Sequence, residues 1–158
     1  QALVAAAMMD WRCYWVSILP NKDIKETETL HKRLHQKESI WLRPSLDICS
    51  RLCVSGIDIE NLFKHVNAKE PDSERIAQSC SNGPATFLIH ADLNHNVIVR
   101  KLQDNEARLL NHCDGTHTVT SLVHEASFYQ QSQKETLRLI HQLIDEGVIT
   151  QFRDKLDS

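Results

Sequence analysis

Histidine and cysteine are the residue types in this sequence best suited to chemistry, because imidazole and thiolate act as bases, nucleophiles and metal ligands. His31 and His35 are spaced i, i+4, so both rings would lie on one face of a helix and could hold a divalent ion. No glutamate lies between them in the metalloprotease arrangement, and the flanking Lys32, Arg33 and Lys37 are typical of a solvated helix face. We therefore interpret this pair as surface histidines.

Two cysteines, Cys49 and Cys53, are also four residues apart and would share one face of a predicted helix. A closed zinc site needs two more donors, and the sequence has no second pair with finger-like spacing. Free cysteine is commonly buried as a small apolar side chain, and this is the interpretation that we favour. Nothing in the sequence beyond composition supports a Cys–His nucleophile pair, for example one that contains Cys80.

A third group, His112, Cys113 and His117, surrounds the turn at Asp114-Gly115. Its spacing matches no closed structural metal site, and polar turn residues explain it equally well. With four glycines in the chain, there is also no glycine-rich phosphate-binding loop. The sequence therefore predicts no catalytic residue, no metal site and no cofactor in this chain.

The composition limits the class of protein. The chain has 158 residues, of which 41% are hydrophobic and 25% charged, as in globular proteins that bury a core. Its net charge of −3 gives no overall attraction to nucleic acid or anionic lipid. No apolar run reaches the roughly 18 residues that span a bilayer, and the apolar stretch 2–9 lacks the basic leader of a signal peptide. Five cysteines, an odd number, do not look like a secreted disulfide framework, so we expect a cytoplasmic location.

The elements that would position these residues differ between the two ends of the chain. From residue 11 to about 66 the pattern is helical. Pro44-Ser45 is typical of a helix start, Gly56 of a helix end, and Asp58 of an N-cap. The apolar residues that recur at three- and four-residue steps are Leu30, Leu34, Ile48, Leu52, Ile59, Leu62 and Phe63.

A polar break at 79–84 separates this part from the rest, and it predicts two domains, 1–83 and 84–158. After the break, short β-branched runs at 86–90 and 96–102 predict an antiparallel hairpin. Three helices and a closing strand at 148–152 follow. Their predicted boundary residues are Asp104, Gly115, Thr118, Ser132 or Gln133, and Gly147.

Hairpin, three helices and closing strand together predict a winged helix-turn-helix. The fold class expected for the whole chain is α+β, mostly helical, with an N-terminal helical domain and a C-terminal winged helix that carries a small antiparallel sheet.

Charge indicates what this winged helix would bind. Residues 84–158 contain seven Lys or Arg and ten Asp or Glu, and the third helix offers Lys134 and Arg138 beside several acids. DNA binding needs several phosphate contacts through cations, and this half lacks them. An exposed sheet edge can instead pair with an extended peptide. We therefore favour peptide capture over a winged-helix transcription regulator, which stays the alternative, and over a small metal-dependent enzyme that uses the histidines.

The same residues resemble the PqqD-type peptide-recognition domain. The segments that carry the resemblance are 97–102, 104–110, the Cys-Asp-Gly-Thr-His-Thr-Val turn at 113–119, and Leu-Ile-Asp-Glu-Gly-Val-Ile at 143–149. Asp104-Asn105 stands where the family usually has Asn. The family normally has three strands before the first helix, whereas this sequence predicts two.

The N-terminal half, with Cys13-Tyr14-Trp15, resembles MbnC-type partner subunits of multinuclear non-heme iron oxidases in methanobactin biosynthesis. The resemblance implies a non-catalytic accessory subunit that binds both the iron enzyme and a precursor peptide. The enzyme, which holds the iron, then converts peptide cysteines to an oxazolone with an adjacent thioamide.

These expectations assign two sets of residues. We predict that the leader segment of the precursor adds as a strand beside Val97, Ile98, Val99 and Arg100. Its apolar side chains would lie against the third helix near Leu137, Arg138 and His141. The predicted partner-binding residues are the aromatic side chains of the helical half, Trp11, Tyr14, Trp15 and Trp41, which the sequence permits equally to form a core.

Overall fold

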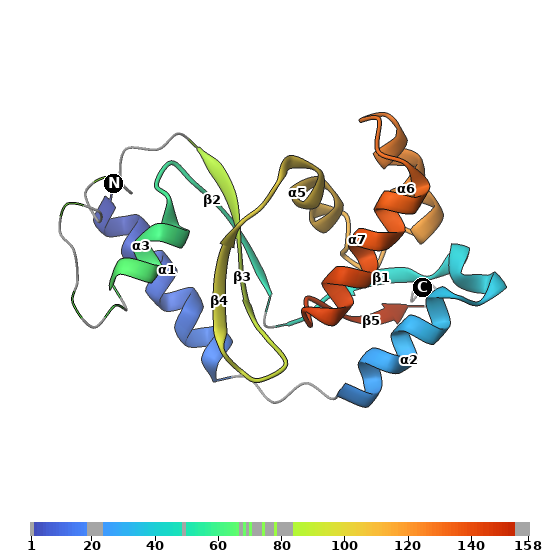
Figure 1. The fold of residues 1–158 in the computed structure, drawn as a ribbon, viewed down its shortest axis with the longest axis horizontal. Coiled ribbons are helices and arrows are strands. Elements are labelled where there is room, and N and C mark those ends of the chain that lie inside the picture. The colour runs from blue at the N-terminus through green and yellow to red at the C-terminus, as the bar shows by residue number, and fades with distance from the viewer. Residues whose placement is uncertain are drawn as a thin grey trace.

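A computed structural model describes residues 2–18, 24–48, 50–66, 68, 70, 74, 78 and 84–153 of the chain (Figure 1). The chain contains both helices and short antiparallel strands, and the α+β class is confirmed. The elements are α1 (Ala2–Ser17), α2 (Ile24–Leu34), the 3-10 helix η1 (Lys37–Trp41), β1 (Arg43–Leu46), β2 (Arg51–Ser55), α3 (Ile59–Val66), β3 (Ala85–Ala91), β4 (Val97–Lys101), α5 (Asp104–Asn111), α6 (Val119–Ser127), α7 (Gln133–Asp145) and β5 (Ile149–Arg153).

The main sheet has three antiparallel strands in the order β2-β3-β4. The predicted hairpin is confirmed as β3 and β4, in which Ile89 lies opposite Val99. Asp92 holds the connecting turn, because its carboxylate accepts the backbone N–H groups of Asn94 and Asn96, both at 2.8 Å. The third strand, β2, was not expected. It pairs along its whole length with β3.

Helices cover both faces of this sheet (Figure 1). On one face Phe87 and Ile89 of β3 are buried against α1 and α3, in a core that includes Val16, Ile59 and Leu62. On the other face Leu88 belongs to a larger core formed with α5, α6 and α7. The alternation of side chains along β3 accounts for this division, and it leaves the central strand almost completely buried.

The three C-terminal helices begin near where the sequence predicts. Thr118 caps α6 through its side chain, and Ser132 caps α7 in a capping box with Glu135. The cap of α5 is Gln103, one residue before the predicted Asp104, because Gln103 and Glu106 exchange hydrogen bonds. Gly147 follows α7 with a φ of 70°, as predicted for a helix stop.

The helix predicted to begin at Pro44-Ser45 is wrong. Residues 43–46 form β1 and residues 51–55 form β2, because these short segments pair with distant strands. β1 pairs with β5 and also contacts the turn after α5. Here Gly115 donates its N–H to the Pro44 carbonyl at 3.0 Å. Gly115 has a φ of 82°, and a Cβ added there would lie 2.9 Å from the Arg153 side chain.

The closing strand β5 therefore pairs with β1 and not with the hairpin, so the winged helix is not confirmed. Each sheet combines a strand from residues 1–83 with strands from residues 84–158, one in the smaller sheet and two in the larger. The predicted boundary between domains 1–83 and 84–158 stays a prediction. Most of the 79–84 break lies outside the described residues. No helix in the described ranges is long and apolar enough to cross a membrane.

Candidate functional site

The outer edge of β4 carries the first group of predicted peptide-binding residues. Two hydrogen bonds, from Asp92 N–H to the Asn96 carbonyl and from Leu102 N–H to the Thr86 carbonyl, fix the alternation of the β3–β4 ladder. In that alternation the peptide groups of Val97, Val99 and Lys101 point away from β3.

These outward groups differ in their partners. The Lys101 N–H donates to the Glu60 carboxylate of α3 at 2.7 Å, so this end of the edge is closed. The peptide groups of Val97 and Val99 have no partner among the described residues. Desolvation acts to raise the pKa of Glu60, but the hydrogen bonds that its carboxylate accepts from Lys64 and from the Lys101 N–H lower it. The open part of the edge therefore runs from Val97 to Val99.

The Arg100 side chain is partly buried and held by two carboxylates. Its guanidinium donates to Glu106 of α5 at 2.9 Å and to Glu146 at the end of α7 at 2.8 Å. Burial acts to lower the pKa of Arg100, but the two carboxylates outweigh it and raise the pKa. Two acids of the same chain thus compensate this cation, which reduces its attraction for an acidic peptide.

The predicted residues of α7 do not form one surface with β4. Leu137 is half-buried against the larger core, and Arg138 is exposed. His141 contacts α2, where its Nδ1 lies 2.7 Å from the Nδ1 of His31 and its ring is 5.2 Å from that of His35. The structure therefore brings His141 to α2, and β4 reaches α7 only at the helix end through Arg100, as far as the described ion pairs show.

The histidine group at the contact of α2 and α7 also includes Asp145, which lies 2.8 Å from the Nε2 of His31. The pKa of His141 is lowered, first by desolvation and then by His31 and His35. The described residues contain no group of three or more His, Cys, Asp or Glu arranged to hold a metal ion. That the purified chain holds no stoichiometric metal stays a prediction.

The cysteines that the structure describes, and the 113–117 turn, can be compared with the sequence predictions. Cys53 lies on β2, so the helix predicted to carry it is wrong, and Cys49 and Cys80 lie outside the described residues. Burial raises the pKa of the Cys113 thiol to about 12. Asp114 accepts hydrogen bonds from Thr116 and His117, as expected of polar turn residues, and its pKa is lowered to about 2 although desolvation opposes this.

The aromatic residues predicted to bind a partner are exposed rather than buried in a core. Trp11, Tyr14 and Trp15 are 60%, 57% and 43% exposed on α1, and the Trp11 and Trp15 rings meet edge to face at 5.5 Å. Trp41 is 64% exposed but lies on η1, which packs against α2 and α6. Three of the four residues therefore form one patch, which we call the aromatic face of α1.

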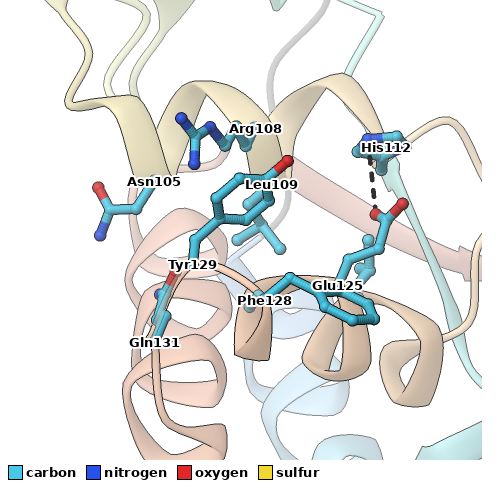
Figure 2. Close-up of a pocket in the computed structure, with 10 residues that line it drawn as sticks. Asn105, Arg108, Leu109, His112, Glu125, Phe128, Tyr129 and Gln131 are labelled. Atoms are coloured by element: carbon cyan, nitrogen blue, oxygen red, sulfur yellow. Dashed lines mark ion pairs between the residues drawn. The ribbon is translucent and has the colours of Figure 1, made fainter.

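A pocket of about 240 Å³ lies between α5, α6 and the turn after α6 (Figure 2). The Arg108 guanidinium stacks on the Tyr129 ring at 3.7 Å, and His112 faces Glu125 at 3.5 Å across the pocket. Leu109, Leu122 and Ala126 contribute apolar lining. Sequence reasoning missed this pocket, for which the adjacent Phe128 and Tyr129 were the available signal. The pocket therefore combines apolar surface with the polar side chains of Arg108, His112 and Glu125.

Comparisons of this chain with protein-family models, with curated proteins and with solved structures found no match.

Proposed function

We propose that this chain is a non-catalytic accessory subunit that binds the leader of a ribosomally made precursor peptide. It presents that peptide to an iron-dependent oxidase, which modifies peptide cysteines to oxazolone and thioamide, as in methanobactin biosynthesis. The oxidase supplies the iron, and the complex acts in the cytoplasm. The proposal extends the sequence resemblance to PqqD-type domains and MbnC-type partner subunits.

The arrangement of strands and helices supports the peptide-recognition part. The resemblance implies a three-stranded sheet beside the helices of the domain, and β2, β3 and β4 form such an antiparallel sheet, with α3 between β2 and β3 in the chain. Helices α5 to α7 then share one core with this sheet. The third strand, β2, comes from residues before the predicted domain 84–158.

The observation that carries the proposal is the open edge of β4. Unpaired N–H and C=O groups on an edge strand can be satisfied by an added strand, which provides backbone affinity that tolerates sequence variation. Val97 and Val99 present such groups, and Glu60 closes the edge at Lys101. We therefore expect a short added strand that pairs along Val97–Val99.

The exposed aromatic face of α1 supports the partner-binding part. Trp and Tyr side chains frequently anchor protein interfaces because they bury a large area at low entropic cost. Trp11, Tyr14 and Trp15 lie together and exposed on one helix. Val16 of the same helix packs into the core, so the exposed face belongs to a helix that is held in place.

The experiment measures leader binding by titration calorimetry, after co-purification has identified the precursor and the enzyme that accompany the full chain. Val97→Pro removes an outward N–H without removing a ladder bond, since proline is tolerated at such edge positions. We expect at least about tenfold weaker leader binding. The matched control is Ile98→Thr, which changes a side chain on the same strand but leaves the outward amides in place.

Arg138→Glu tests the α7 side of the predicted groove. Arg138 is exposed, so its reversal should leave the melting temperature nearly unchanged. If α7 contributes to the groove, leader binding weakens by on the order of 1 kcal/mol. Unchanged affinity in Arg138→Glu moves the groove away from α7, whereas unchanged affinity in a folded Val97→Pro variant contradicts the proposal.

A further inference from the structure

The second edge of the main sheet, β2, also has no neighbouring strand among the described residues. Phe87 and Ile89 of β3 bond to Cys53 and Arg51, so the peptide groups of Leu52 and Val54 point outward. The Leu52 carbonyl accepts a hydrogen bond of 2.7 Å from the Arg12 guanidinium, so α1 contacts this edge. The Val54 carbonyl has a weak contact of 3.9 Å with the Cys53 thiol, and the Val54 side chain is 75% exposed. The edge therefore offers the amides of Leu52 and Val54 to an added strand.

A hollow joins this edge to the aromatic face of α1. It has a volume of about 530 Å³ and is lined by Trp11, Arg12, Trp15 and Arg51. The two tryptophans contribute apolar surface, and the two arginines come from α1 and β2. An extended chain paired with β2 would therefore place alternate side chains next to this hollow.

The arginines of this hollow donate to backbone carbonyl oxygens. Arg12 donates to the Leu52 carbonyl, and Arg51 donates to the carbonyls of Ile48 and Ser50, at distances from 2.6 to 2.9 Å. Neither forms an ion pair with a carboxylate of the described residues. Arg100, in contrast, is paired with two carboxylates. Carbonyl partners leave the positive charge unneutralised, so the hollow favours a carboxylate.

We infer that β2 and the aromatic face of α1 form a docking surface for an acidic, extended segment of a second protein. The segment pairs its backbone with Leu52 and Val54, directs carboxylates to Arg12 and Arg51, and lays apolar side chains over the tryptophans. The inference rests on the proposed function in one respect, namely that the second protein is the partner enzyme. It specifies that the docking segment of that enzyme is acidic and extended. β2 and β4 are opposite edges of the sheet, so the peptide and the enzyme segment can be bound together.

The test uses a fluorescein-labelled synthetic peptide with the repeat Glu-Thr-Val-Thr, in which glutamate and valine share one face of the strand, and a second peptide with lysine in place of glutamate. Fluorescence anisotropy with the full chain measures both. We expect the glutamate peptide to bind at least about tenfold more tightly than the lysine peptide, and to weaken at about 0.5 M salt. Methylation of alternate backbone amides of the glutamate peptide should abolish binding, because it removes the strand hydrogen bonds.

Variants locate the binding. Arg51→Glu and Val54→Pro should each weaken binding of the glutamate peptide at least about tenfold. Lys134→Glu makes an equal charge change on the exposed surface of α7 and should leave this binding unchanged. Arg51→Glu keeps the test decisive if proline at position 54 impairs folding, which circular dichroism would detect. Val97→Pro, on the β4 edge, separates this surface from leader binding: it should affect the leader and not the glutamate peptide.

Three results would overturn the inference. The first is equal binding of the glutamate and lysine peptides, and the second is equal loss in Lys134→Glu and Arg51→Glu. The third is self-association of the chain, seen by light scattering, that disappears in Arg51→Glu, which would assign the surface to a second copy. Leader binding measured on the same variants shows separately whether the proposed function holds.

Discussion

Replacing Arg100 by methionine removes the cation that joins β4 to α5 and α7. Methionine keeps a long apolar side chain in place of the arginine stem, so packing changes less than charge. Glu106 and Glu146 then lose their hydrogen-bond donor at 2.9 and 2.8 Å. We expect the free energy of unfolding to fall, because two partly buried carboxylates remain without a counter-charge.

The magnitude follows from burial. The side chains of Arg100, Glu106 and Glu146 are 22%, 11% and 27% exposed, so water screens this network only in part. A hydrogen bond to a charged group contributes about 1.5–3 kcal/mol, and breaking a fully buried pair costs about 3–5 kcal/mol. For this intermediate burial we expect a loss of about 2–4 kcal/mol.

Urea unfolding followed by circular dichroism measures this loss. The matched control is Lys64→Met, which breaks a 2.6 Å pair with Glu60 in which Lys64 is 60% exposed and Glu60 26%. An exposed i, i+4 pair contributes less than about 1 kcal/mol, so this variant should be nearly neutral. Arg100→Met combined with Glu106→Gln should recover part of the loss, because one unpaired carboxylate is removed.

The reasoning is refuted if Arg100→Met costs no more than Lys64→Met. It also fails if the folded Arg100→Met chain loses leader affinity about tenfold, since that would show the guanidinium available to the peptide. A destabilised variant with intact leader affinity assigns Arg100 to the fold.

Three further outcomes are expected. Gly115→Ala should lower the free energy of unfolding by about 1–2 kcal/mol, because the φ of 82° at Gly115 and the 2.9 Å approach to Arg153 both disfavour a Cβ. Gly56→Ala, with open space around it, should change this free energy by less than about 0.5 kcal/mol, as measured by urea unfolding. Iodoacetamide at pH 7 should modify Cys113 only after unfolding, since its pKa is about 12 and the thiol is buried, and mass spectrometry of native and denatured samples checks this. Because the pKa of His141 is lowered in the fold, its contribution to stability is present above pH 6.5 and is lost as the pH falls from there through the lowered value; the decrease in melting temperature between pH 8 and pH 5 should be smaller in His141→Gln.

Local signals account for what could be predicted of the fold. Thr118, Ser132 and Gly147 act through bonds or backbone angles within a few residues, so the sequence around them was sufficient. β2 could not be predicted in the same way. Ile48 and Leu52 fit helical spacing, and the strand is defined by pairing with β3, whose partner residues lie 30 to 38 positions away. No local pattern in the sequence around residues 51–55 indicates that pairing.

The candidate sites divide in the same way. An open edge on β4 could be proposed from the predicted hairpin, because the outer strand of a small sheet leaves its outward N–H and C=O groups unpaired. The exposure of Trp11, Tyr14 and Trp15 could not, because a helix with aromatic residues on several sides can bury either face. The contact of His31 with His141 joins residues 110 positions apart, and no periodicity reveals it.

The pairing of β1 with β5 has a consequence for how the chain is made. Arg43 pairs with Arg153, so during translation β1 leaves the ribosome roughly 110 residues ahead of its partner. At synthesis rates of about 5–20 residues per second, its backbone groups stay unpaired for many seconds. Contacts between residues so distant in sequence also slow folding, because a long loop must close before any bond forms. A nascent chain with an open strand for this time is exposed to aggregation, and we expect its yield in cells to rise when a chaperone or the partner enzyme is supplied during synthesis.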